Sequence, residues 1–289
     1  MLVDGALGAC GLIVGTGLIK GIVFEAWDLH VRRYTVALRD LPQSLVGFRI
    51  AQISDTHLGP RIPASHVRAA VELALSLKPD LVALTGDYIH MGSKYVPMAA
   101  ELFRPLCAGG RAAPVVGTLG NHDWYGDGHE VAAAMSRVGV TMIDNSRVFL
   151  DADTRRVTRG PVTQGVCIAG LGDLREDSID PRGALRGVPD DMARVVLAHN
   201  PDSAEELVIG RRPPPRLDVM LSGHTHGGQV YVPLRGTPFI PSRYGQKYAG
   251  GMVEGPYCRV VVSRGVGMSI FPARLGVPPE VVEITLTRA

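Results

Sequence analysis

Short apolar runs that close on small polar clusters recur along most of this chain, and stretches of helical periodicity separate several of them. Between Pro63 and Pro79, apolar residues of 64–77 recur at three- and four-residue spacing, which predicts a helix. Further helices are predicted at 96–107, 128–138 and 203–208. Strands are predicted at 34–38, 48–53, 80–85, 114–119, 140–143, 166–171, 194–198, 218–221, 229–232, 257–263 and 281–286.

The order of these elements predicts the fold class. Strands alternate with helices in the first half, which is typical of an α/β protein with right-handed crossovers and helices on the outer face of its sheet. The last third is mostly β, which adds α+β character, and residues 147–164 are polar without a clear pattern. The strand at 34–38 is expected at an edge of the sheet.

An apolar stretch at residues 5–24 is about as long as a bilayer-spanning helix, roughly 20 residues. We interpret it as a membrane anchor within a segment 1–33, followed by a catalytic domain over 34–289; a buried helix and a leader are the alternatives. Basic residues follow the stretch, so the positive-inside rule places the domain on the cytoplasmic side of the cytoplasmic membrane. A soluble cytoplasmic protein is the other location considered.

Composition sets limits on the class of protein. Hydrophobic residues make up 46% of the chain and charged residues 20%, so a sizeable buried core is expected. The formal net charge of +2 gives no electrostatic argument for nucleic-acid binding. The four cysteines form no C-x-x-C pair, which argues against a zinc ribbon or a redox motif. Nothing in the pattern predicts an oligomeric state.

Residues of metal-ligand type follow five of the predicted strands. They are Asp55 and His57, Asp87, Asn121 and His122, His199, and the pair His224 and His226. In an open α/β sheet the carboxyl ends of the strands lie along one edge, where ligands bind. So many buried polar groups need a counter-charge, and a metal centre supplies it. The mixed oxygen and nitrogen donors suit manganese, iron, zinc or magnesium.

The pair His224 and His226 follows a sharp turn at Ser222 and Gly223. Neutral imidazole is the commonest protein metal ligand. Two histidines one residue apart can therefore bind one metal together or two adjacent metals separately.

Taken together, these motifs resemble those of the calcineurin-like metallophosphoesterases across residues 49–229. The matching motifs are Asp55-Thr56-His57, Gly86-Asp87, Gly120-Asn121-His122-Asp123, His199 and Gly223-His224-Thr225-His226. The resemblance implies a four-layer fold, in which two packed mixed β-sheets are flanked by helices, and a site for two divalent metal ions.

The resemblance also implies a role for each residue. Asp55, His57 and His226 would hold one metal and Asn121, His199 and His224 the other, with Asp87 bridging both. The implied reaction is in-line attack by a metal-bridging hydroxide on a phosphodiester or pyrophosphate bond. His122 would stay unligated. Beside the proposed ligand Asn121 it would donate a proton to the leaving oxygen or stabilise developing charge, and Asp123 would orient its imidazole.

Two local features indicate which branch of the family this chain resembles. Tyr88-Ile89-His90 stands where protein serine/threonine phosphatases of this superfamily carry Asp-Arg-Gly, which argues against that activity. The segments 199–202, 227–229 and 262–265 resemble bacterial membrane-associated phosphodiesterases, including enzymes that act on UDP-2,3-diacylglucosamine in lipid A synthesis. The expected substrate is a small or lipid-linked phosphate ester. A broad phosphomonoesterase or nuclease is the alternative enzyme, and a non-catalytic binding scaffold is the alternative from another class.

Several further residues admit two interpretations. Arg264 is a candidate for binding a substrate phosphate, or braces a loop. Asp173 either supports the metal ligands or caps a turn. Tyr244 and Tyr248 fit a lid or ordinary loop packing. Histidines outside the motifs are expected to have core or surface roles; they are His30, His66, His90 and His129.

Overall fold

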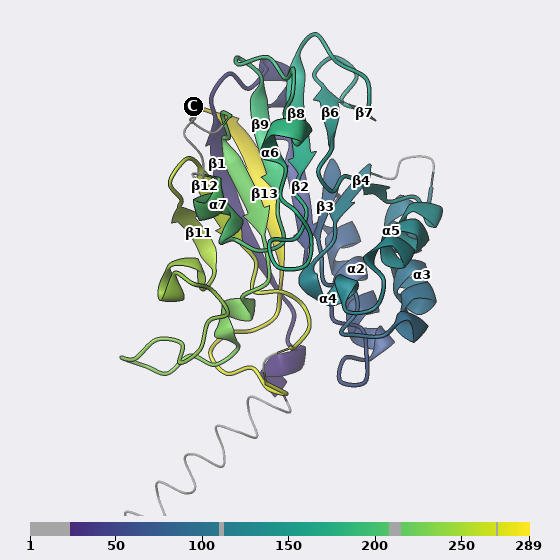
Figure 1. Cartoon of the computed structure of the whole chain (residues 1–289), viewed down its shortest axis with the longest axis vertical. Helices are drawn as coiled ribbons and strands as arrows, with labels where there is room; N and C mark the ends of the chain where they lie inside the picture. Colours follow the sequence, from purple (N-terminus) through teal and green to yellow (C-terminus); the bar gives the residue numbers. More distant parts are fainter. Residues whose placement is uncertain (1–23, 110–112, 208–214, 270) are drawn as a thin grey trace, which may run out of the picture.

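Two mixed β-sheets pack face to face and carry helices on their outer sides (Figure 1). The computed structural model describes residues 24–109, 113–207, 215–269 and 271–289. This arrangement confirms the four-layer fold of two packed mixed sheets flanked by helices.

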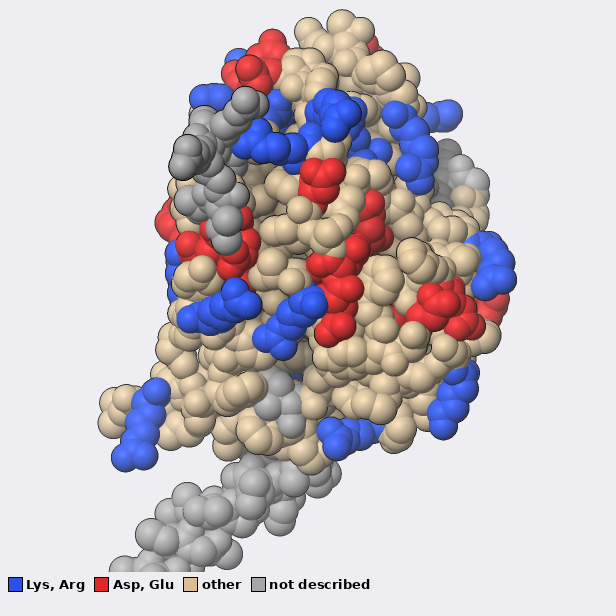
Figure 2. Space-filling view, in the orientation of Figure 1, with Lys and Arg blue, Asp and Glu red and all other residues tan. Residues whose placement is uncertain are grey.

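Basic and acidic side chains both occur over the upper part of the face shown in Figure 2, whereas the lower end of that face is mostly uncharged.

The first sheet has six strands. In spatial order they are β1 (His30–Leu38), β13 (Glu280–Arg288), β2 (Arg49–Ile53), β3 (Leu81–Thr85), β4 (Val115–Thr118) and β5 (Thr141–Met142). Strands β2 to β5 are parallel, while β13 runs antiparallel to β2 and parallel to β1. Its outer face is covered by α2 (Ala64–Ser76), α3 (Val96–Cys107) and α5 (Gly128–Arg137). These helices follow the parallel strands in sequence, as crossover connections require.

The second sheet has seven strands. In spatial order they are β11 (Gly251–Glu254), β12 (Arg259–Val262), β10 (Val219–Ser222), β9 (Ala193–Leu197), β8 (Gly165–Gly170), β6 (Arg147–Asp151) and β7 (Val157–Thr158). Strands β8, β9, β10 and β12 are parallel. Its outer face packs against the short helices α6 (Pro181–Ala184) and α7 (Ser203–Glu206). The remaining short helices are α4 (Asn121–Trp124), η2 (Glu25–Trp27), η3 (Gln43–Leu45), η4 (Ser93–Tyr95), η5 (His226–Gly228) and η6 (Gly245–Tyr248).

Alternation of side chains along the central strands builds the separate hydrophobic cores. In β2, Ile50 packs between the two sheets, whereas Ala51 and Ile53 pack under the helices. Strand β3 repeats this pattern, with Leu81 facing the other sheet and Val82 facing the helices. Because these strands are buried on both faces, they appear in the sequence as continuous apolar runs rather than as alternating ones.

Three parts of the second half differ from the sequence prediction. The strand predicted at 229–232 is wrong: this segment forms only isolated bridges, because Gln229 has a left-handed φ of +63° that an extended strand excludes. The segment 147–164 contains β6 and β7, although its composition is polar. Strand β11 was not predicted, since its alternating burial leaves only short apolar cues.

The N-terminal prediction falls mostly outside the described residues, which begin at Phe24, the last residue of the apolar stretch 5–24. Within the part of the chain that the structure describes, no helix has the length and apolar character needed to cross a bilayer. Strand β1 begins at His30, four residues earlier than predicted, so part of the segment 1–33 pairs with β13.

We predict that Ile284→Ala destabilises the protein by about 2 to 5 kcal/mol. Ile284 is fully buried between the sheets and pairs with Tyr34 on one side and Ile50 on the other, so truncation leaves a cavity. Urea unfolding measures the change. Leu75→Ala on α2, where the side chain is 39% exposed, is the control and should cost less than about 1 kcal/mol. Equal losses in both variants would contradict a tightly packed core between the sheets.

Candidate functional site

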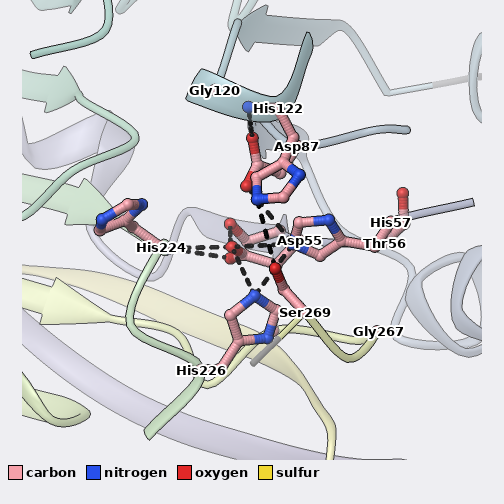
Figure 3. Close-up of polar contacts among 12 residues, drawn as sticks. Asp55, Thr56, His57, Asp87, Gly120, His122, His224, His226, Gly267 and Ser269 are labelled. Atoms are coloured by element: carbon pink, nitrogen blue, oxygen red, sulfur yellow. Dashed lines mark hydrogen bonds and ion pairs between the residues drawn. The ribbon is translucent and has the colours of Figure 1, made fainter. Parts of the chain in front are cut away.

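The ligand-type residues meet at one edge, where parallel strands of both sheets end (Figure 3). From the first sheet, Asp55 follows β2, Asp87 follows β3 and Asn121 follows β4. From the second, His199 follows β9, and His224 and His226 follow β10. All seven proposed metal ligands, which include His57, are buried. The two sheets therefore contribute to the same site from opposite sides.

Left-handed backbone at the strand ends aims the ligands into this site. Five of the seven have positive φ angles, between +48° and +69°: Asp55, His57, Asp87, His224 and His226. Such angles are uncommon outside glycine and cluster at functional sites, where packing holds the strained conformation in place. The change of handedness turns each side chain away from the direction of its strand.

The first donor group contains Asp55, His57 and His226. The Nε2 atoms of the two histidines are 2.9 Å apart, and the Oδ1 of Asp55 is 3.4 Å from His226 Nε2 and 3.9 Å from His57 Nε2. The second group contains Asp87, His199 and His224. Here His199 Nε2 is 3.3 Å from His224 Nδ1. The first group is the trio that the resemblance implied for one metal, and the second joins Asp87 to His199 and His224 of the other trio. The two groups divide His224 and His226 between them, and the assignment of ligands to metals stays a prediction.

Asp87 belongs to both groups by position. Its Oδ2 lies 3.3 Å from His57 Nε2 and 3.2 Å from His199 Nε2. Its Oδ1 accepts a hydrogen bond from the backbone N–H of His122 at 2.8 Å, which fixes the plane of the carboxylate. A single oxygen therefore faces both groups.

Unpaired buried atoms show that a cation fits this donor set. Asn121 Oδ1 and His224 Nε2 are buried without a hydrogen-bond partner among the described residues. Asn121 Nδ2 donates to the hydroxyl of Tyr125 at 2.9 Å, which leaves Oδ1 as the atom available to a metal. Buried polar atoms without partners are costly, and a divalent ion held by the second group would satisfy Asn121 Oδ1.

Burial and mutual attraction set the proton distribution of these groups. Burial lowers the pKa of His57, His224 and His226 well below the usual histidine value, so these imidazoles stay unprotonated. Burial opposes charge on Asp87 and His199 too, but the two groups attract each other. This attraction holds the pKa of Asp87 well below the usual aspartate value and raises the pKa of His199 well above the usual histidine value.

Backbone contacts hold the ligands in place. His199 Nδ1 donates to the carbonyl of Thr85 at 2.7 Å, so Nε2 faces the site. The carboxylate of Asp55 accepts the N–H of His224, which links the two sheets across the site. Gly223 makes this approach feasible, because a Cβ there would collide with Ser54 and Asp55.

Asp123 has a different role from the one expected. Its carboxylate makes no hydrogen bond to the ring of His122; it accepts backbone N–H groups from Asp87, Tyr88, Ile89 and Gly120. These bonds fix the turn that carries Asp87. The expectation that Asp123 orients His122 is therefore wrong, because a carboxylate three residues into this turn caps the neighbouring backbone instead.

The His122 ring is held by His90, which the motifs did not single out. His122 Nδ1 donates to the carbonyl of His90 at 2.6 Å, and the two rings stack with centroids 5.1 Å apart. His90, His122 and His57 form a third donor cluster, which shares His57 with the first group. Stacking between residues 32 positions apart has no local signal in the sequence.

Arg274 is a second residue that sequence reasoning missed. It is fully buried and donates to the carbonyls of Arg264, Gly265, Gly267 and Val277. This bracing fixes the loop that packs on Asp55, since Gly267 N donates to the Asp55 carbonyl at 2.7 Å. Its guanidinium also lies 3.4 Å from His226 Nδ1 and disfavours protonation of that ligand.

The remaining candidates lie around the site with separate roles. Asp173 caps a turn by accepting the N–H groups of Arg175 and Glu176. The side chain of Arg264 lies against Gly250 and Gly227, so phosphate binding by Arg264 stays a prediction. Tyr248 is fully buried and donates to Glu205, as loop packing predicts, whereas Tyr244 is 39% exposed.

We predict that His224→Ala and His226→Ala each remove a different metal. Each histidine belongs to one donor group only, so each variant should retain about one metal per chain where the unmodified protein binds two. Metal content after dialysis, measured by mass spectrometry, gives the stoichiometry. His129→Ala, an exposed histidine outside the groups, is the control. Loss of both metals from each variant would contradict the division.

The chain is similar to known phosphoesterases. The family model for calcineurin-like phosphoesterases matches residues 48–228. The "Uncharacterized metallophosphoesterase YkuE" of Bacillus subtilis is 31% identical, covering 98% of this chain and 94% of that protein. "Phosphodiesterase YaeI" of Escherichia coli is 32% identical, covering 83% and 82%. "UDP-2,3-diacylglucosamine pyrophosphatase LpxG" of Chlamydia trachomatis is 27% identical, covering 75% and 77%.

The family match contains the whole donor set. Residues 48–228 make up more than half of the chain and include every proposed ligand from Asp55 to His226. Relatives above 30% identity extend the similarity over most of both chains. The chain belongs to the calcineurin-like phosphoesterase family and is a metal-dependent phosphoesterase.

Proposed function

We propose that this phosphoesterase hydrolyses phosphodiester or pyrophosphate bonds with two divalent metal ions. The observation that carries the proposal is the position of Asp87 Oδ2, 3.3 Å from His57 Nε2 and 3.2 Å from His199 Nε2. One oxygen shared between two donor groups suits two cations held side by side. One relative is named a phosphodiesterase and another a pyrophosphatase, which supports these two bond types.

The charge of the donor set favours an anionic substrate. Asp55 and Asp87 supply two negative charges, and the other proposed ligands are neutral when they bind a metal. Two divalent cations would leave a net positive site, which a phosphate ester balances. Bound metals would lower the pKa of a water molecule and neutralise charge on the phosphoryl oxygens.

We propose His122 as the proton donor to the leaving oxygen. Its ring stands nearly perpendicular to that of His57, with centroids 4.5 Å apart, but its Nε2 belongs to neither of the two metal groups. Because Nδ1 is engaged with the His90 carbonyl, Nε2 is the ring atom available for proton exchange. General acid catalysis of this kind contributes about 100- to 10,000-fold.

Manganese is the metal we propose, with iron, zinc or magnesium as alternatives. Two carboxylates and an amide oxygen are hard donors, whereas the imidazoles are borderline, and manganese accepts both kinds. Among the described residues no cysteine joins a donor group, so thiolate ligation has no support.

For the substrate we propose a lipid-linked nucleotide such as UDP-2,3-diacylglucosamine, an intermediate of lipid A synthesis. Similarity to LpxG over 75% of this chain supports this class. A broad phosphomonoesterase or nuclease would use the same donor set, although the net charge of +2 gives little attraction for nucleic acid. A non-catalytic scaffold of this fold would be expected to lack ligands, and all seven are present.

The test compares hydrolysis of UDP-2,3-diacylglucosamine and of a chromogenic phosphodiester, with manganese. Asp87→Ala should abolish both activities, because it removes the oxygen shared by the donor groups. His122→Ala should lower kcat by about 100- to 10,000-fold for a poor leaving group. Asp153→Ala, at an exposed turn, is the control. Unchanged rates in Asp87→Ala would reject the metal mechanism. If the enzyme cleaves the chromogenic phosphodiester rapidly but leaves UDP-2,3-diacylglucosamine intact, the lipid substrate is rejected.

We also propose that this protein contacts the cytoplasmic face of the cytoplasmic membrane, with a lipid bilayer against an apolar groove of about 940 Å³. Phe24, Trp27, Tyr231 and Pro233 line it, together with Glu25, Asp28, His30, Leu275, Gly276 and Pro278. The apolar stretch 5–24 reaches the fold at Phe24, so a bilayer that held this stretch would lie beside the groove. The lower end of the molecule in Figure 2 is mostly uncharged with separate basic side chains.

Brominated lipids provide the test, because they quench tryptophan fluorescence only at close range. The chain has two tryptophans, and Trp27 is 38% exposed while the indole nitrogen of Trp124 is buried. Vesicles with brominated chains should quench Trp27 in full-length Trp124→Phe and leave Trp124 unquenched in the matched Trp27→Phe. Vesicle-bound protein without Trp27 quenching would reject this face, and protein that stays off vesicles would reject membrane contact.

A further inference from the structure

The hydroxyl of Ser269 lies against the proposed proton donor. Its Oγ is 3.2 Å from His122 Nε2, although the two residues are 147 positions apart (Figure 3). Ser269 belongs to none of the motifs, and it follows β12 in a segment beyond the matched residues 48–228. The contact involves the single ring nitrogen that the His90 carbonyl leaves free.

The hydrogen bonds of His122 define the role that this hydroxyl can have. A carbonyl oxygen only accepts, so Nδ1 must carry the proton that it donates to His90. In the neutral ring Nε2 then accepts a hydrogen bond, and in the protonated ring it donates one. A hydroxyl group does both, so Ser269 can stay bonded to His122 in either protonation state.

Gln229 fixes the backbone that presents Ser269. The Gln229 side chain is fully buried, and its Oε1 accepts the N–H of Ser269 at 3.0 Å. Its Nε2 donates to the carbonyls of Phe271 at 2.6 Å and Ala273 at 2.8 Å. The backbone N–H of Gln229 in turn donates to the carbonyl of His226, a proposed metal ligand. Ser269 is therefore placed by the same turn that carries His226.

We propose that Ser269 is a positioning residue: its hydroxyl holds the His122 ring in place, and the oxygen of the departing group then replaces that hydroxyl as the acceptor of the Nε2 proton. The inference rests on the proposed role of His122 as the proton donor. A ring fixed at Nδ1 alone can still tilt about that bond, and the hydroxyl at Nε2 fixes the second point. Misplacement of a catalytic group by about 1 Å costs up to roughly 100-fold in rate.

Leaving-group dependence provides the test. Two phosphodiesters are compared with the full-length manganese enzyme: one releases p-nitrophenolate, which leaves without a proton, and the other releases an alkyl alcohol, which needs one. Ser269→Ala should lower kcat for the alkyl ester by about 10- to 100-fold and change kcat for the nitrophenyl ester less than about threefold. Ser269→Thr, which keeps the hydroxyl, should recover much of the alkyl-ester activity.

Two further measurements separate the possible causes. In a His122→Ala background, Ser269→Ala should cause no additional loss, because the ring that it positions is gone. Metal content should match that of the unmodified enzyme. Equal losses for both esters, or no loss, would overturn the role of Ser269. If His122→Ala itself shows no selective loss with the alkyl ester, the proposed proton donor is rejected instead, so the two failures are distinguishable.

Discussion

The burial of two carboxylates against four imidazoles is the constraint on which this structure depends. Charges and donors taken out of water are costly unless cations or hydrogen bonds compensate them. Here the Nε2 atoms of His57 and His226 approach to 2.9 Å, and Asn121 Oδ1 has no partner within the described chain. Such an arrangement is stable only with a proton or a cation between the donors. The buried donor atoms that the fold leaves without a partner are therefore what makes this a candidate metal site.

The strand ends and the hydrogen bonds around them hold the ligands in place. Strand ends from both sheets approach the site, and left-handed residues turn the ligands inward after β2, β3 and β10. Hydrogen bonds that Asp123 accepts from the turn of Asp87, and that Arg274 donates to the loop over Asp55, then fix the strained backbone. Ligand geometry thus depends on residues that bind no metal.

One segment connects the metal site to the apolar end of the molecule. Gln229 follows the turn of His226, and its side chain accepts the backbone N–H of Ser269. Two residues later, the backbone N–H of Tyr231 donates to the carbonyl of Leu275. Tyr231 and Leu275 also line the apolar groove. The proposed proton donor, a metal ligand and the proposed lipid-facing surface are consequently held by neighbouring turns of the same chain.

The sequence by itself predicted most of the elements and the strand ends at which the candidate ligands stand. The helix at 96–107 has the bounds of α3, and Asp55, Asp87 and His199 follow predicted strands, because strand patterns and the polar residues that end them are local. Only the tertiary structure decided that Gln229 leaves the strand conformation, that Asp123 caps a turn, and that Ser269 meets His122. Those outcomes depend on contacts between residues about 35 to 147 positions apart. A local pattern cannot encode them, since they arise where two sheets and the loops between them converge.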